Sequence, residues 1–136
     1  MTLDNKITTF LAGKRFAVVG ASRDRSKYGN KVLRAFQQNR FDVVPVNPNA
    51  DKVEGLQAYP DLKSLHGSID GISVITPPEV TEKVVEQAVQ LGIKNIWLQP
   101  GAESEQSVND AERVGANLIS GGPCILVALH FHDEEQ

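Results

Sequence analysis

Residues 16–30 read FAVVGASRDRSKYGN, and this stretch decides the fold class. Residues 16–19 are short and continuously apolar, which is typical of a parallel strand buried on both faces. Gly20 permits a tight turn after that strand, and residues 28–38 then carry apolar side chains at helical spacing. The stretch therefore predicts a strand, a glycine turn and a helix, which is the opening unit of an α/β domain.

The same alternation continues outward to both ends of the chain. Further apolar runs stand at 43–46, 72–75, 96–98 and 118–119, and a short amphipathic helix is expected before the first strand. Helical spacing recurs over 79–91 and from Ser104, a suitable N-cap, to Gly115. The expected buried face of the 79–91 helix consists of Val80, Val84, Ala88 and Leu91. With 136 residues, the chain has the length of one domain, and we expect residues 1–136 to form it.

This pattern predicts a Rossmann-like three-layer α/β/α sandwich around a five-stranded parallel sheet. We expect the strand order 3-2-1-4-5. Pro45 conflicts with that order, because the order makes its strand internal and proline cannot donate a hydrogen bond to a neighbouring strand. We therefore expect Pro45 near the end of its strand or at a bulge.

Composition excludes several classes of protein. The chain is 40% hydrophobic and 23% charged, as globular domains are, and no apolar run approaches the length of a membrane span. The formal net charge of -3 favours neither nucleic acid nor a membrane surface as a partner. One cysteine, Cys124, and the absence of an export signal predict a cytoplasmic protein.

The loop after the first strand is the strongest candidate site. Ligands of open α/β sheets bind beyond the carboxyl ends of the strands, and this loop also precedes a helix N-terminus. It offers the turn at Gly20, the hydroxyl and amide of Ser22, and an excess of cations. The cations are Arg23, Arg25 and Lys27, against one anion, Asp24. Solvated loop charges would explain the same residues, but the position of the loop favours phosphate binding.

The loop does not match the NAD fingerprint, which needs three glycines at G-x-G-x-x-G spacing. Here the glycine after Gly20 is Gly29, and Asn47 and Pro48 stand where the ribose-binding acid is expected. A nicotinamide dinucleotide is therefore less favoured than a ligand with a pyrophosphate and an additional phosphate.

Several stretches together resemble the coenzyme A (CoA)-binding domain family related to the N-terminal part of the succinyl-CoA synthetase alpha chain. More narrowly, the chain resembles the small stand-alone members, over about residues 14–129. The resemblance rests on residues 18–22, 28–29, 44–48, 55, 59–60, 70, 97–101, 111 and 115, in that order along the chain.

The resemblance implies a Rossmann-like fold that binds CoA or acyl-CoA across the first three loops. Gly20, Ala21, Ser22 and Arg23 would hold the pyrophosphate, and Asn47 and Pro48 would lie against the adenosine. Ile75, Thr76 and Pro77 would flank the middle of the ligand. Lys27 is added from its charge as a partner for the ribose phosphate, and Tyr28 and Gln99 complete the candidate set. For Gln99, a structural role at the Pro100-Gly101 turn is slightly favoured over ligand contact.

The family usually has an acidic-basic-cysteine run before the last helix, where this chain has residues 121–124, GGPC. No pair of carboxylates is placed for acid-base catalysis, and Cys124 has no evident activating base. His130 and His132 are two ligands at most, so no metal site is predicted, and with residues 133–135 they are expected to form a solvated tail.

We therefore predict no catalytic residues and a binding or regulatory role. A subunit of a CoA-thioester enzyme and an NAD(P) sensor remain the alternatives, and a homodimer or a protein partner is left open.

Overall fold

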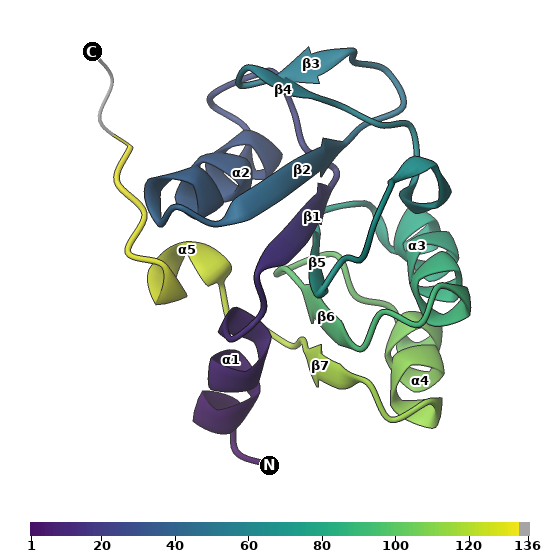
Figure 1. The fold of residues 1–136 in the computed structure, drawn as a ribbon. Coiled ribbons are helices and arrows are strands. Elements are labelled where there is room, and N and C mark those ends of the chain that lie inside the picture. The colour runs from purple at the N-terminus through teal and green to yellow at the C-terminus, as the bar shows by residue number, and fades with distance from the viewer. Residues whose placement is uncertain (134–136) are drawn as a thin grey trace.

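The computed structural model describes residues 1–133 and contains a parallel sheet between two layers of helices (Figure 1). The strands are β1 (Arg15–Val19), β2 (Asp42–Val46), β3 (Lys52–Val53), β4 (Leu56–Gln57), β5 (Gly71–Val74), β6 (Asn95–Leu98) and β7 (Asn117–Ile119). The helices are α1 (Leu3–Leu11), α2 (Tyr28–Gln38), α3 (Pro78–Gln90), α4 (Glu105–Arg113) and α5 (Ile125–Ala128), with a 3-10 turn, η1, at Leu62–Ser64.

The predicted fold class is confirmed. Strands β2, β1, β5, β6 and β7 form one sheet in which every neighbouring pair is parallel. Helices α1, α2 and α5 cover one face, and α3 and α4 cover the other (Figure 1). The sequence did not reveal the small antiparallel hairpin of β3 and β4.

The predicted strand order 3-2-1-4-5 is wrong, because the five strands follow the order 2-1-3-4-5. β2 is an edge strand, and its outer side is met only at its end, by a bridge between Val46 and Tyr59. The N–H of Tyr59 donates to the carbonyl of Pro45, so this carbonyl points away from β1. The backbone nitrogen of Pro45, which carries no hydrogen, faces the same outer side. The third strand of the sheet, β5, pairs with the other side of β1, and the missing N–H of Pro45 costs no hydrogen bond between strands because Pro45 lies in an edge strand.

Two separate cores lie on the two faces of the sheet. The face under α1, α2 and α5 is aromatic: Phe16 stacks on Phe10 and Phe36 with ring centroids 5.2 and 5.0 Å apart. The face under α3 and α4 is aliphatic. Helix α2 packs on the aromatic core through Val32, Leu33 and Phe36.

The predicted buried face of α3 is partly wrong. Its buried residues are Thr81, Val85 and Ala88, whereas Val80 is 43% exposed and Leu91 49% exposed. The side of the helix that carries Val80 and Val84 lines a cavity, and the side that carries Thr81 and Val85 faces the core.

The predicted tail is solvated at His130, His132 and Asp133, which are exposed, but it is also tethered to α2. Gln38 of α2 exchanges two hydrogen bonds with the backbone of His132, and Arg34 pairs with the carboxylate of Asp133 at 2.9 Å. Glu134 and Glu135 lie outside the described residues. No helix within residues 1–133 combines the length and the apolar character that a membrane crossing needs.

Candidate functional site

The turn after β1 is closed by two glycines. Gly20 has φ +97°, and a Cβ at this position would lie 2.0 Å from the carbonyl oxygen of Ile75. A Cβ at Gly29 would in turn lie 2.0 Å from the carbonyl oxygen of Gly20. The first approach packs the end of β1 against the residue that follows β5. The second packs the first turn of α2 against the end of β1, which is the role of the third glycine in dinucleotide-binding loops.

The loop presents backbone donors that the protein does not use. Among the described residues, the N–H groups of Ala21, Ser22 and Arg23 have no acceptor. Helix α2 follows this loop, and its N-cap residue, Lys27, makes no side-chain hydrogen bond to the first N–H groups of the helix. The Ser22 hydroxyl accepts a hydrogen bond of 3.0 Å from the N–H of Asp24, which holds the loop in a tight turn. Successive free amides at a helix N-terminus form a binding site for a phosphate.

A buried network holds this loop from behind. Asn30, fully buried, donates to the carbonyl of Ser22 at 2.8 Å and to the carboxylate of Glu54 at 2.9 Å. Arg34 donates to the side-chain oxygen of Asn30 at 2.6 Å. Glu54 also pairs with Arg25 at 2.5 Å, so one of the three loop cations is neutralised by a residue of the β3–β4 turn. No local pattern of residues indicated this pairing.

The loop after β2 is tied to the loop after β1. The Asn47 side-chain amide donates to the carbonyl of Ala21 at 2.7 Å, and its side-chain oxygen accepts from the N–H of Asn49 at 2.7 Å. The side chain of Asn47 therefore positions the two loops, and Pro48 follows it at the wall of a cavity.

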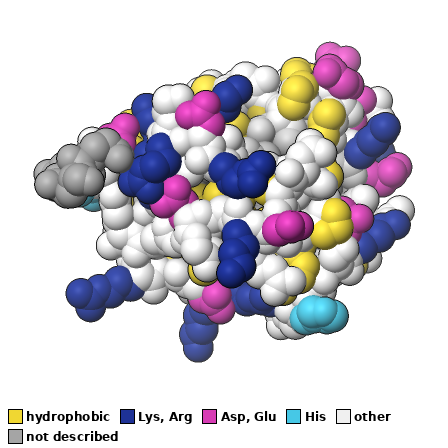
Figure 2. Space-filling view, turned by 90° about the horizontal axis from the view of Figure 1, so that it is seen from above, with side chains coloured by type: hydrophobic (Ala, Val, Ile, Leu, Met, Phe, Trp, Pro, Cys, Tyr) yellow, Lys and Arg dark blue, Asp and Glu magenta, His cyan; other side chains and the backbone are white. Residues whose placement is uncertain are grey.

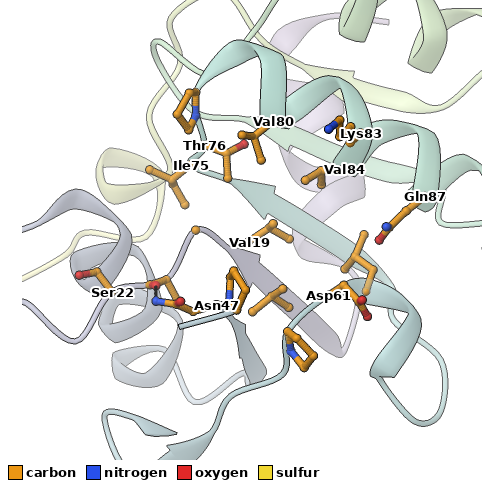
Figure 3. A pocket seen from close by; sticks show the side chains of 17 residues that line it. Val19, Ser22, Asn47, Asp61, Ile75, Thr76, Val80, Lys83, Val84 and Gln87 are labelled. Carbon is orange, nitrogen blue, oxygen red and sulfur yellow. Dashed lines mark hydrogen bonds between the residues drawn. The ribbon is translucent and has the colours of Figure 1, made fainter. Parts of the chain in front are cut away.

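That cavity, of about 430 Å³, lies between the carboxyl ends of β1, β2 and β5 and the exposed stripe of α3 (Figure 3). Of the predicted site residues, the structure brings eight to it: Gly20, Ala21, Ser22, Asn47, Pro48, Ile75, Thr76 and Pro77. Nine further lining residues were not predicted as site residues: Val19, Val46, Pro60, Asp61, Leu62, Val80, Lys83, Val84 and Gln87. The walls are therefore largely apolar, with backbone donors at the end near Ser22.

One signal could have found part of the missed set. The α3 sequence carries Val80 and Val84 one position away from the buried Thr81 and Val85, which makes its apolar stripe wider than the core needs. Nothing comparable marks Pro60 to Leu62, because these residues reach the cavity only through the path of the chain after the β3–β4 hairpin.

A second cavity, of about 320 Å³, lies on the other side of the β5–α3 turn. Ile75, Thr76 and Pro77 line both cavities, and residues 100–102 close the second one. The Thr76 hydroxyl is held by the buried Thr81 hydroxyl at 2.6 Å, which fixes the wall between the two cavities.

Four predicted site residues do not reach the larger cavity. Arg23 and Lys27 are exposed beside it, whereas Gln99 is fully buried and Tyr28 half-buried. The Tyr28 hydroxyl donates to Gln99 at 3.0 Å and contacts the sulfur of Cys124 at 2.5 Å. Burial, and then the bond with Cys124, raises the pKa of Tyr28 far above its ordinary value of 10.0, so the phenol stays protonated.

The Gln99 amide also donates to Ser73 and accepts from the N–H of Ile125, both at 3.0 Å. Its side-chain atoms are thus bonded to Tyr28, Ser73 and Ile125, and not to the Pro100-Gly101 turn at which the sequence slightly favoured a structural role.

The surface around the strand ends carries mixed charges. Figure 2, which looks down on the side where β1 and β2 end, shows Lys and Arg interspersed with Asp and Glu, and hydrophobic side chains on the part away from the grey residues. An anionic ligand must therefore be attracted by local groups rather than by one basic face.

The comparison with protein families decides the assignment: the model described as a CoA binding domain matches residues 14–130. The chain belongs to the CoA-binding domain family. The resemblance that the sequence indicated over residues 14–129 is thereby confirmed.

Relatives of this CoA-binding domain are of two kinds. An uncharacterized protein of Bacillus subtilis, YneT, is 31% identical over 115 residues, which cover 85% of this chain and 84% of that protein. An ADP-forming acetate–CoA ligase of Archaeoglobus fulgidus is 34% identical over 101 residues, 73% of this chain. The chain matches only 15% of the length of that ligase.

Solved structures of similar proteins share the fold of this CoA-binding domain. A conserved hypothetical protein from Pyrococcus furiosus is 40% identical with a TM-score of 0.80, over 85% of this chain and 99% of the other. A hypothetical protein from Pyrococcus horikoshii is 26% identical with a TM-score of 0.88, over 96% of this chain and 90% of the other.

Proposed function

We propose that this domain binds CoA or an acyl-CoA, with the pyrophosphate on the backbone amides of residues 21–23. The observation that carries the proposal is the set of three successive N–H groups without an acceptor, beside the uncapped N-terminus of α2. Such amides suit a phosphate because they supply partial positive charge and need no side-chain reorganisation.

The rest of the ligand follows from the two cavities. The larger one has largely apolar walls, which include Pro48, Pro60, Val80 and Val84 and suit the faces of an adenine ring. The pantetheine arm would cross the Ile75–Pro77 turn into the second cavity. The match of the chain to a family described as a CoA binding domain supports this assignment over a nicotinamide dinucleotide.

We infer a binding or regulatory role rather than catalysis by this chain. Of the described residues that line the larger cavity, Asp61 and Lys83 are the titratable ones. Asp61 accepts two hydrogen bonds from Ser64, at 2.9 and 2.7 Å, and so serves the 3-10 turn. A second candidate, a CoA-binding module of a larger thioester-forming enzyme, is supported by the similarity to the acetate–CoA ligase.

The test is the thermal unfolding of the protein with CoA, acetyl-CoA, NAD and NADP. At a hundredfold excess over Kd, a ligand specific for the native state stabilises it by about 2.7 kcal/mol, which raises Tm by several degrees. We expect that rise with CoA or acetyl-CoA. A rise with NAD or NADP alone would show that the ligand class is wrong. Release of free thiol from acetyl-CoA by the isolated protein would refute the non-catalytic role.

A charge placed in the amide loop tests the position of the site. Ser22→Glu puts a carboxylate among the amides proposed for the pyrophosphate, so we expect it to abolish the rise in Tm with CoA. Ser68→Glu is the matched control, because Ser68 is exposed and lies in the loop before β5, outside both cavities. An undiminished rise in the Ser22 variant would remove this loop from the site.

A further inference from the structure

Lys83 is the one cation among the described residues that line the larger cavity. It lies on α3 between Val80 and Val84, on the wall across from Ser22 and Asn47 (Figure 3). Glu79 and Glu86 are one helical turn away on either side, yet Lys83 forms no ion pair with any described residue. Its ammonium group is therefore available to an anion in the cavity.

Lys27, which the sequence suggested for the ribose phosphate, occupies a different place. It is exposed at the start of α2, its backbone N–H donates to Asp24 at 3.0 Å, and its side chain does not line the cavity. A positive charge at Lys27 is therefore outside the set of residues that line the cavity.

The two walls of the cavity differ in charge. Asp61, the residue before η1, lies opposite Gln87 of α3 (Figure 3). Its carboxylate repels a phosphate on the wall formed by the chain before η1. The amides of residues 21–23 can hold the pyrophosphate but are at the other end of the cavity. A phosphate carried on the ribose therefore finds its counter-charge on α3.

We propose that Lys83 recognises the 3′-phosphate on the ribose of CoA and thereby sets a preference for CoA over dephospho-CoA. This inference rests on the proposed function. It adds the residue that would distinguish CoA from dephospho-CoA, two ligands that differ only in the 3′-phosphate. An ammonium at this site donates a charge-assisted hydrogen bond to the phosphate, which dephospho-CoA cannot accept.

The experiment is isothermal titration calorimetry with CoA and dephospho-CoA on the unaltered protein and on Lys83→Gln, Lys83→Arg and Lys27→Gln. We expect the unaltered protein to prefer CoA and Lys83→Gln to weaken CoA binding about tenfold while dephospho-CoA changes less than twofold. Lys83→Arg should keep most of the preference because it keeps the charge. Lys27→Gln, the matched control, should keep all of it. Equal melting temperatures without ligand establish that the variants fold alike.

Each contrary result has its own meaning. An equal loss for both ligands in Lys83→Gln would overturn the inference, since it would place Lys83 away from the 3′-phosphate. Loss of the preference in Lys27→Gln but not in Lys83→Gln would return that role to Lys27. An unaltered protein that binds both ligands equally would refute the inference and leave the proposed function standing. Binding of neither ligand would refute both.

Discussion

The side-chain amide of Asn47 donates a hydrogen bond of 2.7 Å to the carbonyl oxygen of Ala21. Twenty-six residues separate the two, and the bond joins the loop after β2 to the loop after β1. It fixes the direction of the Ala21 carbonyl, next to N–H groups of residues 21–23 that have no acceptor among the described residues. A residue predicted to lie against the ligand thus also shapes the loop that would hold the phosphates.

Replacing Asn47 by Asp tests that relationship. The carboxylate cannot donate to Ala21 and stands against its carbonyl oxygen, so we expect a loss of about 1–2 kcal/mol in the free energy of unfolding and weaker CoA binding. Urea denaturation and calorimetry measure the two effects. The control is Asn49→Asp, which makes the same charge change at an exposed residue and should alter stability by less than about 0.5 kcal/mol. Equal effects of the two variants would contradict a role for the bond.

Gly20→Ala tests the close approach of β1 and β5. The change adds strain at a positive φ and a clash with the carbonyl of Ile75, a residue held in place by the hydrogen bond from its N–H to Val19. We expect a loss of about 3 kcal/mol or more, measured by chemical denaturation. Gly92→Ala is matched in φ, at +77°, but has nothing within 4 Å of the added Cβ, and should cost only about 1 kcal/mol. Similar costs would show that the contact with Ile75 is unimportant.

Gln99→Leu separates a structural from a ligand-binding role. The variant leaves the N–H of Ile125 and the hydroxyl of Ser73 without their partner, so we expect about 2–3 kcal/mol lower stability. Because Gln99 is fully buried, the Kd for CoA measured on folded protein should change less than twofold. A large loss of affinity with unchanged stability would instead make Gln99 a ligand contact.

Asp70 makes the stability depend on acid pH. Its carboxylate accepts hydrogen bonds from the N–H groups of Lys14 at 2.7 Å and Arg15 at 2.9 Å, which lower the pKa of Asp70 below its ordinary value of 3.8. A carboxyl group whose pKa is lower in the folded state than in the unfolded state stabilises the fold at pH values above its unfolded-state pKa. That stabilisation is lost as the pH falls through the folded-state pKa. We therefore expect Asp70→Asn to be less stable than the unaltered protein at pH 7, with the difference shrinking below about pH 4. Urea denaturation at a series of pH values measures it, and a difference that does not vary with pH would contradict the assignment.

The helices and strands were largely predictable because they depend on local pattern. Helix α2 has the predicted bounds, and Ser104 caps α4 in a capping box with Ser107. The strand order was not predictable in this way, since it depends on which edge of β1 or β2 accepts the third strand. Pro45 was the residue that bore on the order. It lies near the end of β2, as expected, and its lack of an N–H is typical of an edge strand, which β2 is.

The sequence by itself determined the α/β class, the family and eight residues of the cavity, because a glycine turn after a strand and the loops at strand ends are set by short stretches of chain. Only the tertiary structure decided that Glu54 neutralises Arg25, that Gln99 is buried among protein donors and acceptors, and that Lys83 rather than Lys27 lines the cavity. The physical reason is that charge and exposure are properties of neighbours in space. Those neighbours come from segments tens of residues apart, whose approach no local pattern records.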